Sequence, residues 1–341
     1  MSLPPAPLAL SLGDPAGIGP ELACAAWAAR AEHGLPPFLV THGAGLLREA
    51  AARRGLDVPV ARIAAPEDAA QVFATALPVL GDADLAYRPG EPDEDGARLA
   101  LASLTEATAL AVSGAAAAVV TGPIAKSELA KIGFAHPGQT EFMAASCGMA
   151  PEEAVMMLAG PQLRTVPLTV HCPLSEVPGR ITMELILRRV RVVDGAMRRD
   201  FALAAPRIAL CGLNPHAGEN GRMGREEIEV IAPAIAALRA EGIEATGPHP
   251  ADSLFAPHAR GSYDVAVAMY HDQALVPLKA LDFDAGVNMT LGLPIIRTSP
   301  DHGTAFAIAG TGAANPGATI AAIRMAAEAA VRRAQPSTSS G

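Results

Sequence analysis

The chain has 341 residues and a net charge of −9 at pH 7; half of its residues are hydrophobic and only 4% are aromatic. This length predicts one large domain or two ordinary ones, and the alanine- and glycine-rich composition favours packed α/β layers over an aromatic-rich β-sandwich. The negative charge argues against nucleic acid as a main partner, because no basic face for phosphates is visible. No apolar run has the length of a membrane span, and the N-terminal segment lacks a basic leader. We therefore expect a cytoplasmic protein without a membrane partner.

The first part of the chain alternates strand-type and helix-type patterns. Residues 8–12 predict a buried strand, and the glycine-rich turn GDPAGIGPE leads from it into a helix with Pro20 in its first turn. The spacing of the glycines is not the GxGxxG dinucleotide fingerprint, so a structural role for this turn is the stronger interpretation. Asp14, at the carboxyl end of the strand, is its candidate functional residue.

Similar patterns continue towards the middle of the chain. Further strand-type runs fall at 36–42, 59–65, 78–87 and 115–121, and helix-type patterns fall at 45–54 and 96–112. A short helix after the turn Gly122-Pro123 carries Lys126. Lysine readily loses its proton when buried and arginine does not, so Lys126 is a candidate base. Thr140 is predicted to be the N-cap of a helix that begins at Glu141, with Gln139 exposed before it.

The second half of the chain repeats one pattern three times. Strand-type runs at 164–170 and 264–270 are followed directly by His171 and His271. A third run, 207–213, is followed after Asn214-Pro215 by His216. In an open parallel sheet, side chains just beyond the carboxyl ends of the strands line the ligand crevice. The three histidines can therefore converge although they are far apart in the sequence.

Three histidines in equivalent positions favour a metal site over separate loop or core histidines. Three imidazoles with an open fourth position suit zinc, cobalt, nickel or iron better than magnesium. Asp272 or Asp252 would add an oxygen ligand or orient an imidazole ring.

Residues 263–304 place further polar side chains after His271: Lys279 in a helical pattern, then Asn288, Arg297 and the run Asp301-His302-Gly303. Helices at 182–203 and 224–242 separate the histidine-bearing strands. We predict a first subdomain of residues 1–140 with 300–335 and a second of residues 141–299. The active-site cleft is expected at their junction. Residues 336–341 are predicted to be a disordered tail.

Several segments together carry a resemblance to a known family. They occur in the order GDPAGIGPE, VTGPIAK, HPGQTEFMA, LTVHCPL, GLNPHAGENGRMGREE, GPHPADSLF, YHDQALVPLK, FDAGVN and DHGTAFAIAGTG. In this order they resemble the 4-hydroxythreonine-4-phosphate dehydrogenase family of pyridoxal phosphate biosynthesis, over nearly the whole chain. The resemblance implies an isocitrate/isopropylmalate-dehydrogenase-like α/β fold with two α/β/α subdomains around a central cleft. It also implies a homodimer whose active site is shared between subunits.

The resemblance also implies ligands and site residues. One divalent metal per site (zinc, cobalt, magnesium or manganese) would be held by His171, His216 and His271, and NAD or NADP would be the oxidant. The substrate-binding positions map to Gln139, Thr140, Lys279, Asn288 and Arg297. The glycine-rich segment after His302, including the tripeptide ANP at 314–316, is similar to the adenosine-side loop of isopropylmalate dehydrogenases. The candidate cofactor residues are Asp14, His302, Gly303, Gly310 and Asn315.

Two positions depart from the family pattern. Gln139 stands where the family usually has histidine, and glutamine can donate a hydrogen bond but carries no positive charge towards a phosphate. Ala307 stands where many members have an acidic residue.

The implied reaction is oxidation of 4-phosphohydroxy-L-threonine by NAD(P)⁺ to a β-keto acid, which decarboxylates to 3-amino-2-oxopropyl phosphate. Lys279, Lys126 and Asp252 are the candidate catalytic residues for the proton transfer. Gln139 keeps open a paralogue that oxidises 4-phospho-D-threonate, D-erythronate phosphate or an aromatic cis-dihydrodiol carboxylate. The alternatives of another class are a metal-dependent hydrolase or lyase, and a non-enzymatic binding protein for phosphorylated acids.

Overall fold

The computed structural model describes residues 6–335. The chain divides into two compact units, one formed by Met1–Pro151 with Leu293–Gly341 and the other by Glu152–Gly292. The predicted tail, residues 336–341, lies outside the described residues. Residues 141–151 and Arg297 belong to the first unit, whereas the sequence interpretation assigned them to the second subdomain. The helix that begins at Gln139 packs on the long helix of the first unit, which explains the shifted boundary.

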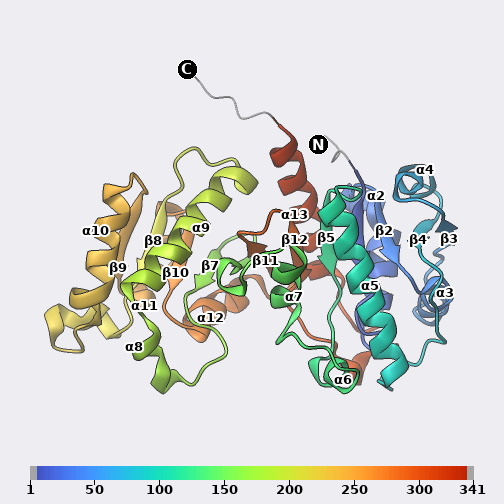
Figure 1. Ribbon diagram of the computed structural model, residues 1–341, viewed down its shortest axis with the longest axis horizontal. Coiled ribbons are helices and arrows are strands. Elements are labelled where there is room, and N and C mark those ends of the chain that lie inside the picture. Colours follow the sequence, from blue (N-terminus) through green and yellow to red (C-terminus); the bar gives the residue numbers. More distant parts are fainter. Residues whose placement is uncertain (1–5, 336–341) are drawn as a thin grey trace. The chain divides into compact units, whose positions relative to one another are not determined.

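The first unit is built on a parallel sheet with the strand order β3-β4-β2-β1-β5-β12. Its strands are β1 (Leu8–Ser11), β2 (Phe38–Thr41), β3 (Val60–Ile63), β4 (Leu77–Leu80), β5 (Ala118–Thr121) and β12 (Arg297–Pro300). Its helices are α1 (Gly19–Ala28), α2 (Arg30–His33), α3 (Ala44–Arg53), α4 (Ala69–Val72), α5 (Glu94–Ser113), α6 (Lys126–Lys131), α7 (Gln139–Ser146) and α13 (Gly317–Ala334). Helix α5 crosses β1, β5 and β2, whereas α13 packs on β12 and β5 and also contacts α1 (Figure 1).

The second unit has a mixed sheet with the order β11-β6-β7-β10-β8-β9. Strand β6 is antiparallel to both β11 and β7, and from β7 to β9 the strands are parallel. Its strands are β6 (Val155–Ala159), β7 (Arg164–Pro167), β8 (Ile208–Cys211), β9 (Ala245–His249), β10 (Val265–Ala268) and β11 (Val287–Leu291). Its helices are α8 (Val177–Arg180), α9 (Met183–Phe201), α10 (Ala232–Ala240), α11 (Ala251–Leu254) and α12 (His271–Asp282).

Short helices of other types complete the two units. The π-helix η5 spans Glu227–Ile231, and the 3-10 helices are η1 (Pro66–Asp68), η2 (Pro151–Glu153), η3 (Leu174–Glu176), η4 (Pro215–Gly221), η6 (Arg260–Ser262), η7 (Phe283–Ala285) and η8 (Phe306–Ile308). None of the helices within residues 6–335 is long and apolar enough to cross a membrane.

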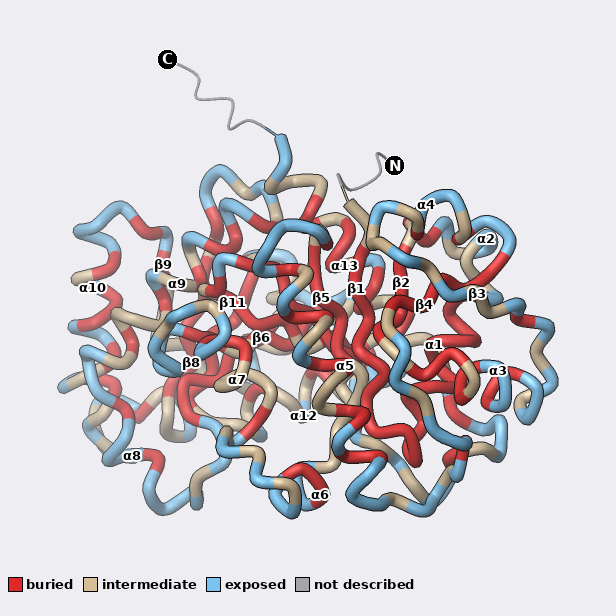
Figure 2. Tube along the Cα trace, turned by 45° about the vertical axis from the view of Figure 1, so that its right-hand side comes forward, coloured by how far each residue is buried: buried red, intermediate tan, exposed pale blue. Residues whose placement is uncertain are grey.

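The core of each unit is formed by those strands whose residues are apolar on both faces. Strands β1, β2, β4, β5, β8 and β10 are buried along their whole length. Figure 2 shows this as a red tube, for example at β1 and β5. Continuous apolar runs of this kind are expected when helices cover both faces of a parallel sheet. The mixed α/β fold predicted from the sequence is confirmed.

Local predictions need correction at three positions. Helix α7 begins at Gln139 with Gly138 as its N-cap, so Thr140 lies inside the first turn and is not the cap. Gln139 is half-buried and not exposed. Asp252, expected on a loop, lies in the short helix α11.

Candidate active site

The three histidine-bearing strands are neighbours in the sheet. Strand β10 pairs in parallel with β7 on one side and with β8 on the other, so the carboxyl ends of all three strands lie on the same edge. The strands are shorter than predicted: β7 ends at Pro167, although the N–H groups of Leu168 and Thr169 still donate to the carbonyls of Ala268 and Met269. His171 and His216 therefore stand on loops beyond the strands, and His271 is the first residue of α12.

Two of the predicted metal ligands lie side by side. The imidazole rings of His171 and His271 have centroids 5.8 Å apart and are tilted by 41°. Nδ1 of His271 is 2.7 Å from Oδ1 of Asp272. Both histidines and Asp272 line a cavity of about 450 Å³. The carboxylate at Nδ1 fixes the orientation of the His271 ring and leaves its Nε2 for a ligand.

The third predicted ligand is held differently. His216 begins a run in which residues 216–220 all have positive φ, between +43° and +79°. Among the side chains of residues 6–335, no three or more His, Cys, Asp and Glu gather closely enough in one chain to hold a metal ion. The exposed Asp252 on α11 does not extend the pair either. A single chain thus brings together two imidazoles of the predicted three.

A buried carboxylate holds the His216 loop in this unusual conformation. Glu227, 3% exposed, accepts hydrogen bonds from the backbone N–H and the side-chain amide of Asn214, at 2.7 and 3.0 Å. Gly218 has φ +79°, and a Cβ there would lie 2.5 Å from Oε2 of Glu227. Gly218 of the NPHAGENG motif is thus needed for close approach to this carboxylate. Sequence reasoning missed Glu227, since nothing in its local pattern marks it as buried.

The first unit contains an arginine suited to bind an anion. Arg297, on β12, is 5% exposed, and burial lowers its pKa to about 10. Its Nη2 donates to Oγ1 of Thr121 and to Oε1 of Gln139, both at 2.8 Å. Nothing in the sequence pattern pointed to Thr121, which closes strand β5.

Gln139 has a supporting role in this arrangement. While its Oε1 accepts from Arg297, its Nε2 donates to the carbonyl of Gly122 at 3.0 Å. Both ends of the carboxamide are therefore used within the protein, and Gln139 orients the guanidinium. The exposed Lys126 lies beside the N-terminus of α7, its Nζ about 3.5 Å from the position that a Cβ on Gly138 would take.

The remaining predicted substrate residues lie in the second unit. Lys279 is on α12, half-buried, two turns after Asp272 and on the same side of the helix. Asn288 is on β11, and its buried Oδ1 accepts no hydrogen bond from the described residues. A buried amide oxygen without a donor is uncommon in a folded chain, which makes Asn288 a candidate for a ligand contact.

The turn after β1 is fixed against the turn after β5. The backbone N–H of Asp14 donates to the carbonyl of Pro123 at 2.8 Å, and a Cβ on Gly13 would lie 2.7 Å from that same oxygen. The Asp14 carboxylate accepts from the N–H of Ala16 at 3.0 Å, and burial raises its pKa above the ordinary value. Asp14 thus helps to hold the turn in shape, in addition to its predicted place near a cofactor.

The predicted cofactor-side loop, which follows His302 and includes Gly310 and Ala314, is tied to α1 and α3. Buried Glu21 on α1 pairs with Arg54 at 3.1 Å, and Arg54 donates to the carbonyl of Ala314 at 2.7 Å. Gly310 has φ +71° and donates weakly to Glu21 at 3.4 Å. Of the other predicted cofactor residues, Asn315 accepts from the N–H of Gly317 at the start of α13, and Nδ1 of His302 lies 3.1 Å from the carbonyl of Gly303.

Residues 35–326 match the family described as pyridoxal phosphate biosynthetic protein PdxA. The chain belongs to this family. It is 60% identical, over 334 residues, to a 4-hydroxythreonine-4-phosphate dehydrogenase of Erythrobacter litoralis, covering 98% of this chain and 99% of that one. The corresponding enzyme of Zymomonas mobilis is 50% identical, with 96% of each chain covered.

Solved structures of PdxA relatives support the same assignment. The 4-hydroxythreonine-4-phosphate dehydrogenase of Klebsiella pneumoniae superposes with a TM-score of 0.85 at 40% identity, covering 95% of this chain and 99% of that one. A terephthalate 1,2-cis-dihydrodiol dehydrogenase from Burkholderia xenovorans also superposes, with a TM-score of 0.64 at 30% identity, covering 95% and 98%. The fold is that of PdxA-family oxidoreductases.

Proposed function

We propose that the chain oxidises 4-phosphohydroxy-L-threonine with NAD⁺ or NADP⁺ in pyridoxal phosphate biosynthesis. The observation that carries this proposal is the 60% identity, over nearly the full length, to a relative named 4-hydroxythreonine-4-phosphate dehydrogenase. In the reaction, a hydride leaves the hydroxyl-bearing carbon for the nicotinamide and the hydroxyl proton goes to a base. The β-keto acid then loses CO₂ to give 3-amino-2-oxopropyl phosphate.

The phosphate of this substrate would bind in the first unit. The buried guanidinium of Arg297 offers a planar fork to phosphate oxygens, and its orientation is set by Thr121 and Gln139. Lys126 adds a second positive charge, and the first backbone N–H groups of α7, with Thr140 in its first turn, add donors at a helix N-terminus. A phosphate bound there would offset the cost of burying the Arg297 charge.

The hydroxyl end of the substrate would be handled by the histidines. His171 and His271 carry imidazole nitrogens of the kind that zinc, cobalt or manganese accepts, and the 5.8 Å separation of their rings fits two ligands of one ion. When bound, the metal polarises the substrate hydroxyl and lowers its pKa. Lys279 is the proposed base, and the amide oxygen of Asn288 would accept a hydrogen bond from the substrate. Lys126 and Asp252 are the alternative proton-transfer residues.

A second copy of the chain would complete the ligand set, giving a homodimer with a shared site. Two imidazoles in one chain are fewer than the three that a catalytic zinc site uses. Large apolar side chains are exposed in the second unit, with Leu174, Val276 and Phe283 each more than 60% exposed. Leu174 lines the same cavity as His171 and His271. Apolar side chains exposed beside ligands favour a subunit contact there.

The nicotinamide cofactor would bind along the cofactor-side loop and the turn at Asp14. Gly303, Gly310 and Asn315 lie on that loop, and His302 stands at its start. Ala307 leaves no carboxylate at its position, so the choice between NAD⁺ and NADP⁺ depends on other residues.

The test compares substrates with a metal-reconstituted enzyme. NAD(P)H formation is measured with 4-phosphohydroxy-L-threonine and 4-phospho-D-threonate side by side, for the wild type and for His216→Ala. Turnover of the first substrate that His216→Ala abolishes is the expected result. Preference for the second would make the chain a sugar-acid paralogue.

An aromatic cis-dihydrodiol carboxylate is a second candidate substrate. The 30% identity to a terephthalate cis-dihydrodiol dehydrogenase and the unusual Gln139 favour including it in the same assay. Turnover of the dihydrodiol without turnover of either phosphorylated acid would remove the phosphate-binding role of Arg297. Turnover of none of the three, with no cofactor bound, would favour a metal-dependent hydrolase or lyase, or a binding protein.

A further inference from the structure

Gln273 connects two histidine-bearing segments through its side chain. It is the third residue of α12, directly after His271 and Asp272, and belongs to the YHDQ run. Its Oε1 accepts from the backbone N–H of Met269 at 2.7 Å, and its Nε2 donates to the carbonyl of Gly212 at 2.9 Å. Neither Met269 nor Gly212 has a role in the chemistry proposed above, and both stand immediately beyond strand ends.

The position of these two bonds follows from the register of the sheet. Val265, Ala266 and Val267 of β10 pair with Ile208, Ala209 and Leu210 of β8. Carried two residues further, this register sets Met269 opposite Gly212. At that point the strands separate, and the carboxamide of Gln273 stands between the N–H of one and the carbonyl of the other. One side-chain amide thus joins the two strands just beyond the point where their backbone pairing ends.

The third strand is fixed to the same point. The carbonyl of Met269 accepts from Oγ1 of Thr169 at 2.9 Å and from the Thr169 N–H at 3.3 Å. Thr169 lies two residues before His171. The N–H and the carbonyl of Met269 are thus bonded in opposite directions, one towards the His216 segment and the other towards the His171 segment.

We propose that Gln273 is a positioning residue for the metal site. Through Met269, whose carbonyl in turn holds Thr169, its amide fixes the strand ends that carry His271 and His171, the two histidines that one chain brings together. This proposal rests on the proposed function of those histidines as metal ligands. The role needs a hydrogen-bond donor and an acceptor at a fixed distance, and the carboxamide of glutamine has both. An ionised glutamate has only acceptors, and methionine has no donor and only a weak acceptor in its sulfur.

The test uses the full-length protein with Gln273→Met and Gln273→Glu. Zn²⁺ affinity is measured by competition with a chromophoric chelator, and the visible absorption of the Co²⁺-loaded protein reports ligand geometry. We expect zinc affinity to fall about 10- to 100-fold in Gln273→Met, the range for losing a residue that orients metal ligands, with an altered cobalt spectrum. Gln273→Glu keeps an acceptor for Met269 but loses the donor to Gly212, so a smaller loss is expected.

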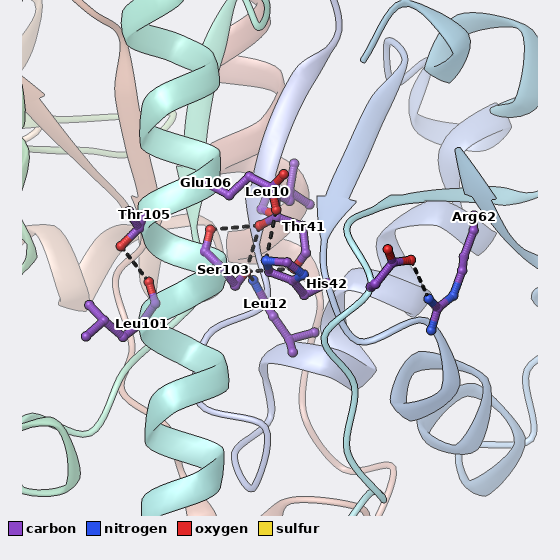
Figure 3. Close-up of polar contacts among 10 residues, drawn as sticks. Leu10, Leu12, Thr41, His42, Arg62, Leu101, Ser103, Thr105 and Glu106 are labelled. Atoms are coloured by element: carbon purple, nitrogen blue, oxygen red, sulfur yellow. Dashed lines mark hydrogen bonds and ion pairs between the residues drawn. The ribbon is translucent and has the colours of Figure 1, made fainter. Parts of the chain in front are cut away.

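Ser103→Ala is the matched control for a lost buried hydrogen bond. The Ser103 hydroxyl accepts from the N–H of Leu12 at 2.7 Å and lies 2.7 Å from the hydroxyl of Thr41, joining α5 to β1 and β2 in the first unit (Figure 3). Its removal lowers stability without touching the histidine segments. Ser103→Ala should keep wild-type zinc affinity and the wild-type cobalt spectrum.

Hydrogen exchange of the metal-free proteins separates this proposal from the metal proposal. The Met269 amide loses its acceptor in Gln273→Met, so the peptide that contains it should exchange faster than in the wild type and in Ser103→Ala. Unchanged exchange there, or unchanged zinc affinity and cobalt spectrum, would overturn the positioning role. If the wild type binds no divalent metal, the metal proposal fails, and faster exchange in Gln273→Met still supports the tie between the strand ends.

Discussion

Removing the carboxamide of Gln139 should weaken phosphate binding through Arg297. In Gln139→Leu the guanidinium loses an acceptor at 2.8 Å, and the carbonyl of Gly122 loses a donor at 3.0 Å. A hydrogen bond to a charged group contributes about 1.5–3 kcal/mol, which corresponds to a factor of about 10 to 150 in affinity. We expect KM for the phosphorylated substrate to rise by a factor within that range, because Gln139 no longer fixes the orientation of the Arg297 guanidinium.

The assay separates orientation of Arg297 from general damage. KM for the phosphorylated substrate and inhibition by inorganic phosphate are measured together with KM for NAD(P)⁺, which should not change. The matched control is Gln162→Leu, which removes another carboxamide with two hydrogen bonds, to the Leu281 carbonyl and to Asp282 in the second unit. Equal KM values for Gln139→Leu and wild type, with the fold intact, would refute the reasoning.

Other variants test the energetics of the same residues. Burial lowers the pKa of Arg297 to about 10, because the folded chain disfavours the buried charge. Ligand-free Arg297→Met should therefore be more stable by about 1–3 kcal/mol and show a higher Tm, although it no longer binds substrate. A lower Tm would contradict this. Burial, and then the charge of Arg239, lower the pKa of His249 below its usual 6.5. Below this pH the unfolded chain binds more protons at His249 than the folded chain does. The free energy of unfolding therefore falls as the pH drops through 6.5. Chemical denaturation from pH 8 to pH 5 should show a smaller fall for His249→Gln, and identical curves would argue against it. Gly310→Ala and Gly312→Ala place alanine at φ +71° and +78°, but only the first puts a Cβ 2.6 Å from Pro89. Calorimetry should therefore find a larger loss of NAD(P)⁺ affinity for Gly310→Ala. Equal losses would mean that the clash with Pro89 is unimportant.

The parts of the fold that were predictable are those whose residues are buried on both sides. The runs that became β8 and β10 are uninterrupted apolar segments, which is the pattern of strands covered by helices on both faces. Their parallel pairing also made the common edge of His171, His216 and His271 predictable. Strands β6 and β11 were not identified, because the methionine-rich run at 155–159 has no strong strand pattern and its antiparallel pairing with β11 depends on residues far away.

The finer geometry of the site was not predictable, because it depends on contacts between distant residues. Gln139 and Arg297 are 158 positions apart, and their hydrogen bond turns a predicted substrate ligand into an orienting residue. The left-handed run at 216–220 depends on the buried carboxylate of Glu227, which no local pattern reveals. Gln273 was visible only as one letter of the YHDQ run, and its two bonds became apparent only with the strand ends in place.

The close packing of the turns after β1 and β5 has a consequence for changing the specificity of the enzyme. The Asp14 N–H donates to the carbonyl of Pro123, and the carbonyl of the neighbouring Gly122 accepts from the side-chain amide of Gln139, which orients Arg297. A substitution in the turn at Asp14, where we propose that the cofactor binds, would therefore also displace the support of the proposed phosphate-binding arginine. The two specificities should show epistasis in directed evolution, so that libraries varying both turns together recover active enzymes that single-turn libraries miss.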